Sequence, residues 1–430
     1  MSKRRWKRRI AWLVLIVLAW LLIDWLIERW YHRGPAVQVK ADAAQIERGR
    51  YLVAAADCAA CHTAEGGAPF AGGVPLASPF GTIHGTNITP DAETGIGRYS
   101  ADEFFHTITR GEARDGHQLY PAMPYVSYKT IAREDSDAIY AYLMTRPPVK
   151  QENRTNGVGF PFNIRTGIHA WNWLFAGAQA RPASQGQSAA WKRGEYLVET
   201  LGHCGECHSP RAWLGQVDRD RPLGGNNTLG RFSSPDITPR GLGERGWDRA
   251  SLRTYLSTGV AVPAVASDEM LKVVNLSTSR LSADDLDAIT VYLTGDAPAE
   301  QKIAAASPAL ATVPASVAGA DASPARASYL NLCAGCHGRE GAGVPHVAPA
   351  LRDNSSVRDA DPHNLIVAIL DGLPEHDLPG LERMQEMPGF ADQLDDAQVA
   401  ELAKWLRGRY GGHAEEVEVK QVQELRKSRD

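Results

Sequence analysis

Apolar residues recur three and four positions apart in three parts of the chain, which predicts amphipathic helices at residues 137–143, 287–293 and 401–406. Upstream of each, an Arg, a small residue and a Tyr-Leu pair predict a second set of helices at residues 48–52, 193–197 and 326–330. Both sets place an aromatic residue where two helices would cross. The pattern therefore predicts one helical unit repeated three times, more clearly in the first two copies than in the third.

The N-terminus carries a different pattern, a long apolar run over residues 10–23 that resumes after Asp24. Six basic residues precede it within residues 1–9. A run of about 17 to 25 apolar residues spans a bilayer, so we expect a transmembrane anchor at residues 10–31, with residues 1–9 as its cytoplasmic flank. A cleaved signal peptide is the alternative, although no small-residue cleavage site follows.

Composition adds little to this picture. The chain has 430 residues, of which 43% are hydrophobic and 22% charged, as in ordinary globular domains. Its formal charge of −4 weighs against nucleic acid as a partner.

The six cysteines carry the chemistry, because all fall into three copies of Cys-x-x-Cys-His. In this spacing two thiols form thioethers to a haem and the histidine reaches the iron. An isolated Cys-x-x-Cys pair is also found in thioredoxin-like proteins and in zinc sites, but three copies that each end in histidine favour three covalently bound haem c groups. The predicted attachment and ligand residues are Cys58, Cys61 and His62, then Cys204, Cys207 and His208, and finally Cys333, Cys336 and His337.

The second axial ligand separates an electron carrier from a haem enzyme with an open iron. Met123 follows Cys61 by 62 residues and Met270 follows Cys207 by 63, and each precedes the downstream helix of its unit. In the third unit Met387 has this place and is followed by proline, as Met123 is, with Met384 as the rival. Ligation by His and Met fills both positions, so we expect one-electron carriers and no catalytic residue.

We therefore expect a mostly α fold, with one N-terminal transmembrane helix followed by three class I cytochrome c domains in tandem. The aromatic linker between the first two domains would pack between them or dock on a membrane or a partner, and the C-terminal tail would be frayed or partner-bound. The expected boundaries are 44–148 for domain 1, 149–186 for the linker, 187–296 for domain 2, 297–322 for a flexible linker, 323–410 for domain 3 and 411–430 for the polar tail.

From about Ala44 to Tyr410 the chain resembles the three-haem cytochrome c subunits of membrane-bound bacterial dehydrogenases. The resemblance rests on these segments: Gly81-Thr82-Ile83, Asn87-Ile88-Thr89-Pro90-Asp91, Gly95-Ile96-Gly97, Tyr120-Pro121-Ala122-Met123-Pro124-Tyr125 and Ser277-Thr278-Ser279. It implies a catalytic partner of the quinoprotein alcohol, flavin sugar-acid or molybdenum aldehyde or N-heterocycle dehydrogenase type. It also implies electron delivery to ubiquinone or another respiratory acceptor.

The expected function is thus an electron-transfer subunit that is no enzyme by itself, at the bacterial inner membrane with its haem domains in the periplasm. A cytochrome that feeds a terminal oxidase directly is the alternative, and a peroxidase-like haem enzyme would need one open iron.

Overall fold

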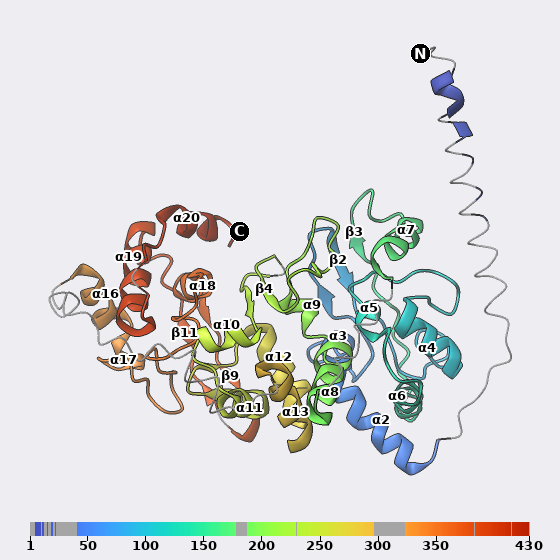
Figure 1. Ribbon diagram of the computed structural model, residues 1–430, viewed down its shortest axis with the longest axis horizontal. Coiled ribbons are helices and arrows are strands. Elements are labelled where there is room, and N and C mark those ends of the chain that lie inside the picture. The colour runs from blue at the N-terminus through green and yellow to red at the C-terminus, as the bar shows by residue number, and fades with distance from the viewer. Residues whose placement is uncertain are drawn as a thin grey trace.

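The structure is a computed structural model that describes residues 41–177, 187–228, 230–295, 323–381, 383–413 and 415–429, with scattered positions between residues 5 and 22. Figure 1 shows the three repeats in a row, the first at the right, the second in the middle and the third at the left. Helices dominate, joined by loops with short antiparallel strands. The predicted mostly α fold is confirmed.

The first repeat is built on the crossing of α2 (Ala43–Ala55) with α6 (Arg133–Met144). Gly49 lies at this crossing, where a Cβ atom would stand 1.9 Å from the carbonyl oxygen of Ala138, so only glycine fits. Between the two helices come α3 (Cys58–His62), β1 (Pro75–Leu76), β2 (Gly81–His84), α4 (Ala101–Arg110) and α5 (Tyr125–Tyr128).

The second repeat has the same frame, because α8 (Ala189–Glu195) crosses α13 (Ala283–Thr294) with Gly194 at the contact. Its first helix continues as the π-helix η1 (Tyr196–Leu201). The elements between are α9 (Gly205–His208), β4 (Gly224–Asn226), β5 (Ser234–Asp236), α10 (Pro239–Glu244), α11 (Arg249–Thr258), β6 (Val260–Ala261), β7 (Ala264–Val265), α12 (Asp268–Leu276) and η2 (Thr278–Arg280).

In the third repeat α16 (Pro324–Leu332) packs on α19 (Asp396–Leu406), and Ala327 replaces the glycine of the other two crossings. The six predicted helical segments thus all lie in helices of the structure. The remaining elements are α17 (Ala334–His337), α18 (His363–Asp371), β8 (Gly372–Leu373), β9 (His376–Asp377), η4 (Pro379–Leu381), β10 (Arg383–Met384), β11 (Met387–Pro388) and η5 (Arg407–Gly411).

Of the two expectations for the C-terminal tail, fraying is wrong for its described residues, and binding to a partner stays a prediction. The tail forms α20 (Val419–Lys427), whose Val422 and Leu425 are buried in the core of the third repeat. Arg426 at its end donates to Asp396 Oδ1 at 2.6 Å and to the carbonyl oxygen of Leu394 at 2.8 Å. Most residues of the tail are polar because the third repeat covers only one side of α20.

The described part of the aromatic linker packs between the first two repeats, which is one of the two expectations above. Its strand β3 (Gly157–Val158) pairs with β2, and its helix α7 (Thr166–Phe175) bridges the repeats. Tyr125 of the first repeat donates to Asn172 Oδ1 at 2.7 Å, and Trp171 Nε1 donates to the carbonyl oxygen of Leu214 in the second at 3.0 Å. The linker therefore joins the two repeats.

The buried apolar side chains form one continuous cluster through the first and second repeats and a separate cluster in the third. A small third cluster joins Ala266 and Val274 of the second repeat to Leu378 and Met384 of the third. The first two repeats thus share one apolar core, whereas the third has a core of its own and shares only the small apolar cluster with the second.

The expected transmembrane anchor at residues 10–31 needs correction. Among the residues that the structure describes, none belongs to a helix with the length and apolar character that a membrane crossing requires. Most of residues 10–31, and the whole expected linker at 297–322, lie outside the described residues.

Candidate functional site

Each Cys-x-x-Cys-His motif forms a short helix directly after the first long helix of its repeat: α3, α9 and α17. In the first two repeats the chain turns into the motif through a residue with left-handed backbone, Asp57 with φ 49° and His203 with φ 38°. All six cysteines are unpaired, so no disulfide competes for the thiols.

The histidine of each motif is oriented by the same contact. Its Nδ1 lies 2.6 Å from the carbonyl oxygen of Thr86 for His62, 2.7 Å from that of Pro235 for His208 and 2.9 Å from that of Pro349 for His337. A carbonyl oxygen only accepts, so Nδ1 carries the proton and Nε2 keeps a lone pair for a metal. Burial lowers the pKa of all three histidines, which also favours the neutral ring. The donor set fits haem iron in all three repeats.

These three carbonyl oxygens escaped the sequence analysis. Thr86 and Pro235 lie in loops that align between the first two repeats, 85–90 and 234–239. This similarity is the one feature of the sequence that could have indicated a shared role for the two loops. Pro349 comes from a shorter loop, 12 residues after its histidine, whereas the other two follow by 24 and 27.

The chemistry of the thiols weighs against a thioredoxin-like pair. Burial raises the pKa of Cys58, Cys61 and Cys204 to about 12, whereas a redox pair needs a lowered thiol pKa. A zinc site is not supported either, because within the described part of the chain no three His, Cys, Asp or Glu side chains gather in a metal-binding group. The first cysteine of each motif and Cys61 are partly buried, whereas Cys207 and Cys336 are exposed.

The predicted methionine ligands lie in different local structures. Met123 precedes α5 in a turn, whereas Met270 is inside α12, and both are half-buried against the shared core of the first two repeats. Met387 in β11 packs against the core of the third repeat, but Met384 is buried in the small cluster at the junction with the second. This placement favours Met387 over Met384, and the ligand assignment stays a prediction.

Met270→Ala is expected to leave the second haem attached, since Cys204 and Cys207 are unchanged. Loss of the methionine sulfur should lower the reduction potential of that haem and shift its iron toward high spin, because a soft sulfur ligand stabilises ferrous iron. Visible spectra and a redox titration measure both effects. Met144→Ala, in a helix core position, is the matched control, and an unchanged spectrum in Met270→Ala would mean that another residue is the ligand.

Asp57 is a second feature that the sequence analysis missed. Its side chain is buried beside the first motif, and its Oδ1 has no hydrogen-bond partner in the protein. Burial raises the pKa of Asp57 to about 8, opposed by the charge of Arg280 and reinforced by that of Glu269. A carboxyl group is thus held largely protonated between the first two repeats.

Asp57→Asn is expected to make the protein more stable at pH 8 and to change little at pH 4. The folded pKa of about 8 lies above the ordinary value of 3.8, so wild-type stability should fall by up to about 1.4 kcal/mol per pH unit between these values. The amide cannot ionise and removes this slope. Urea unfolding at a series of pH values measures it, with exposed Asp220→Asn as control, and parallel pH profiles for wild type and Asp57→Asn would contradict the assignment.

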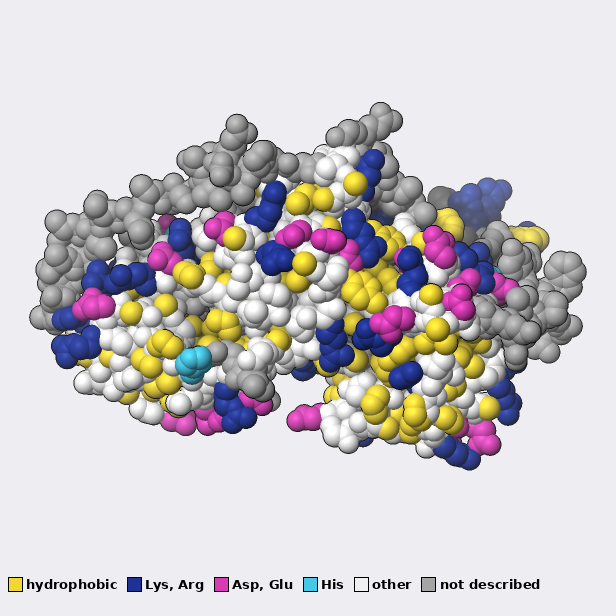
Figure 2. Space-filling model, turned by 90° about the horizontal axis from the view of Figure 1, so that it is seen from below, with side chains coloured by type: hydrophobic (Ala, Val, Ile, Leu, Met, Phe, Trp, Pro, Cys, Tyr) yellow, Lys and Arg dark blue, Asp and Glu magenta, His cyan; other side chains and the backbone are white. Residues whose placement is uncertain are grey.

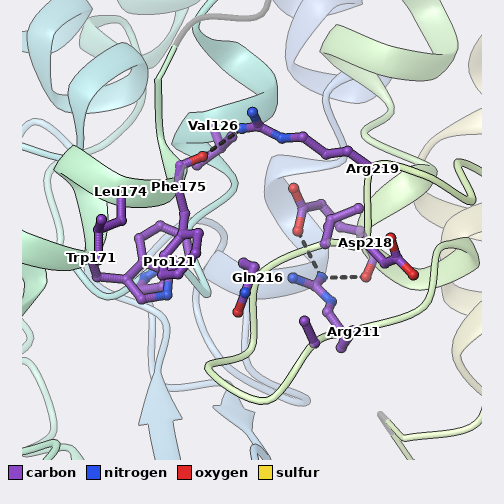
Figure 3. A pocket seen from close by; sticks show the side chains of 12 residues that line it. Pro121, Val126, Trp171, Leu174, Phe175, Arg211, Gln216, Asp218 and Arg219 are labelled. Atoms are coloured by element: carbon purple, nitrogen blue, oxygen red, sulfur yellow. Dashed lines mark hydrogen bonds and ion pairs between the residues drawn. The ribbon is translucent and has the colours of Figure 1, made fainter.

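A pocket of about 270 Å³ lies where α7 meets the first two repeats. Figure 3 shows Trp171, Leu174 and Phe175 of α7 on one side and Arg211 and Asp218 of the second repeat on the other. Glu206, inside the second motif, also lines it and accepts hydrogen bonds from Ser127 of the first repeat at 2.9 Å and from Arg211 at 2.7 Å. The pocket borders the second motif and the seam between two repeats.

Comparison with known proteins agrees with this geometry. The sequence model of the cytochrome c family matches residues 46–147 and 322–409, which cover the first and third repeats. The gluconate 2-dehydrogenase cytochrome c subunit of Pantoea cypripedii is 37% identical over 405 residues, which are 90% of this chain and 91% of the relative. The chain belongs to the family of dehydrogenase cytochrome c subunits.

The names of two further relatives of this cytochrome c subunit refer to different dehydrogenases. The cytochrome c subunit of the quinone alcohol dehydrogenase of Gluconobacter oxydans is 35% identical, over 91% of this chain and 84% of the relative. A nicotinate dehydrogenase subunit of Pseudomonas putida is 40% identical over 86% of this chain, which spans only 30% of that longer relative. Electron transfer within a dehydrogenase complex, with no catalysis of its own, is therefore the role of this family.

Proposed function

We propose that this cytochrome c subunit carries three haems and relays electrons from the catalytic subunit of a periplasmic dehydrogenase to ubiquinone or another respiratory acceptor. The observation that carries the proposal is the contact repeated in all three units, a motif histidine, partly buried in the first two and buried in the third, whose Nδ1 is bonded to a backbone carbonyl oxygen. Haem c, once bound, supplies one-electron iron chemistry. The protein supplies thioether attachment through six cysteines, a histidine of fixed orientation in each repeat, and Met123, Met270 and Met387 as second ligands.

The location and partners belong to the same proposal. We propose that the repeats lie in the periplasm, at the inner membrane, and the Cys-x-x-Cys-His motifs support this because c-type haem is attached outside the cytoplasm in bacteria. Figure 2 shows hydrophobic side chains gathered on the right half of the face seen from below, over the first repeat and its junction with the second. Exposed apolar surface supports a contact with another subunit there.

Purification of the tagged protein under gentle detergent extraction tests the function. Recovery of a dehydrogenase catalytic subunit, whether quinoprotein, flavin or molybdenum type, is the expected result, together with three covalent haems per chain. Recovery of an oxidase core would support direct delivery to a terminal oxidase instead. A ferrous spectrum that changes with carbon monoxide would point to an open iron and to catalysis.

A further inference from the structure

Two clusters of the same composition join the first and second repeats. In one, Asp135 accepts from Arg48 Nε at 2.9 Å and from the hydroxyl of Tyr196 at 2.8 Å. In the other, Asp285 accepts from Arg193 Nε at 2.8 Å and from the hydroxyl of Tyr51 at 2.6 Å. Each arginine belongs to the same repeat as its aspartate, and each tyrosine comes from the other repeat.

The two clusters are related by the sequence repeat. Arg48 and Tyr51 occupy the positions of Arg193 and Tyr196 in the first long helix, and both aspartates lie in the first turn of the second long helix. The backbone repeats the contact, since the N–H of Ala132 donates to the Tyr196 hydroxyl at 3.2 Å and that of Ser282 to the Tyr51 hydroxyl at 3.1 Å. The contact is therefore reciprocal, as in a twofold-symmetric dimer, but within one chain.

The aspartates are well shielded, with only 3% of the Asp135 side chain and 11% of the Asp285 side chain exposed. Burial alone would raise the pKa of Asp285, but hydrogen bonds from Arg193 and Tyr51 lower it. A shielded, ionised carboxylate makes strong hydrogen bonds to its donors. Each tyrosine hydroxyl is thus a directional contact added to the apolar packing.

The arrangement brings the first two haem motifs together. Helix α3 of the first motif contacts α12 of the second repeat. Tyr128 of the first repeat donates to the carbonyl oxygen of Ala56, just before the first motif, at 2.8 Å, and its ring centroid lies 5.6 Å from that of His203, just before the second motif. The third motif is held within its own repeat, where His337 Nδ1 lies 2.9 Å from the carbonyl oxygen of Pro349 and Cys333 packs against the separate apolar core.

The third repeat is attached differently. Arg231 of the second repeat donates through Nε to Asp371 of the third at 2.5 Å. Arg245 and Trp247 of the second repeat donate to the hydroxyl of Ser355 in the third at 3.1 and 3.0 Å, beside a small apolar contact. This contact does not repeat the tyrosine clusters. The interface between the first two repeats is therefore a special feature and not a general way of stacking these units.

We propose that Tyr51 and Tyr196 are positioning residues that hold the first two haem motifs next to one another as a single electron-exchange unit, with the third motif standing apart. This inference rests on the proposed function, because it concerns how neighbouring haem sites are arranged for transfer.

The test uses Tyr51→Phe, Tyr196→Phe and the double variant of the haem-loaded full chain. Phenylalanine keeps the buried ring and removes only the hydroxyl, so the fold should persist. Tyr140→Phe is the matched control, because its hydroxyl donates to the carbonyl oxygen of Tyr99 within the first repeat. The readout is the exciton couplet in the Soret region of the circular-dichroism spectrum. This couplet arises between neighbouring haems that have a fixed relative orientation.

The two single variants should weaken this signal equally, because the contacts are reciprocal, and the double variant most. Each lost hydroxyl should lower, by about tenfold, the equilibrium constant that favours the docked arrangement of the first two repeats over an undocked one. The absorbance of the haems should stay unchanged. A double variant with the wild-type signal at equal haem content, or an equal loss in Tyr140→Phe, would overturn the inference. A wild-type chain without covalent haem would overturn the proposed function instead.

Discussion

Replacement of Cys204 and Cys207 by alanine is expected to remove one of the three proposed haems and to stop electron transfer through the chain. Without thioethers the second site would depend on His208 and the predicted ligand Met270 alone, which do not retain the group covalently. The second repeat lies between the other two in the fold, so its loss should interrupt the relay between them (Figure 1). Mass spectrometry counts the haems, and the reduction rate of an added acceptor measures transfer.

The control for this variant is Gly335→Ala, which changes the interior of the third motif at a position where an added Cβ has open space. It should retain every haem and the full transfer rate. Wild-type transfer in a Cys204→Ala, Cys207→Ala protein that has lost one haem would show that electrons bypass the second site.

Gly194→Ala is expected to destabilise the second repeat by about 3 kcal/mol, the upper range for an overpacked core. The new Cβ would stand 2.0 Å from the carbonyl oxygen of Ala288 and 2.7 Å from the Cβ of Tyr292, so α8 and α13 must separate. The haem motif follows directly after η1, and the crossing helices hold it against the shared core. Chemical unfolding and the covalent haem content measure the damage.

Gly167→Ala is the matched control, since this glycine is also helical but its Cβ would meet no atom within 4 Å. It should be neutral or slightly stabilising, because alanine restricts the unfolded chain. An equal loss of stability in both variants would mean that the crossing is not as tight as described. The third repeat already has Ala327 at this position, so its two helices meet without a glycine contact.

Much of the candidate site could be predicted from sequence because its chemistry is local. Two cysteines and a histidine within five residues define a haem attachment point without reference to the rest of the fold. The six helical segments were also predictable, since amphipathic spacing reports which side of a helix is covered. The membrane helix expected from the N-terminal run is not supported, since no helix of the described residues has the length and apolar character that a crossing requires.

Contacts between distant residues could not be predicted. The carbonyl oxygens of Thr86, Pro235 and Pro349 orient the histidines through backbone atoms, which any residue type could supply. Likewise α20 has few apolar residues, and Val422 and Leu425 are covered only because the third repeat lies beside them.

By itself, the sequence determined three haem motifs, a mostly helical fold and the family, since each depends on residues close together or on a repeated pattern. Only the tertiary structure decided that Tyr51 meets Asp285 and that Tyr196 meets Asp135, across separations of 234 and 61 residues. The reason is that hydrogen bonds between repeats depend on how the helices pack, and this packing arises from the whole shared core.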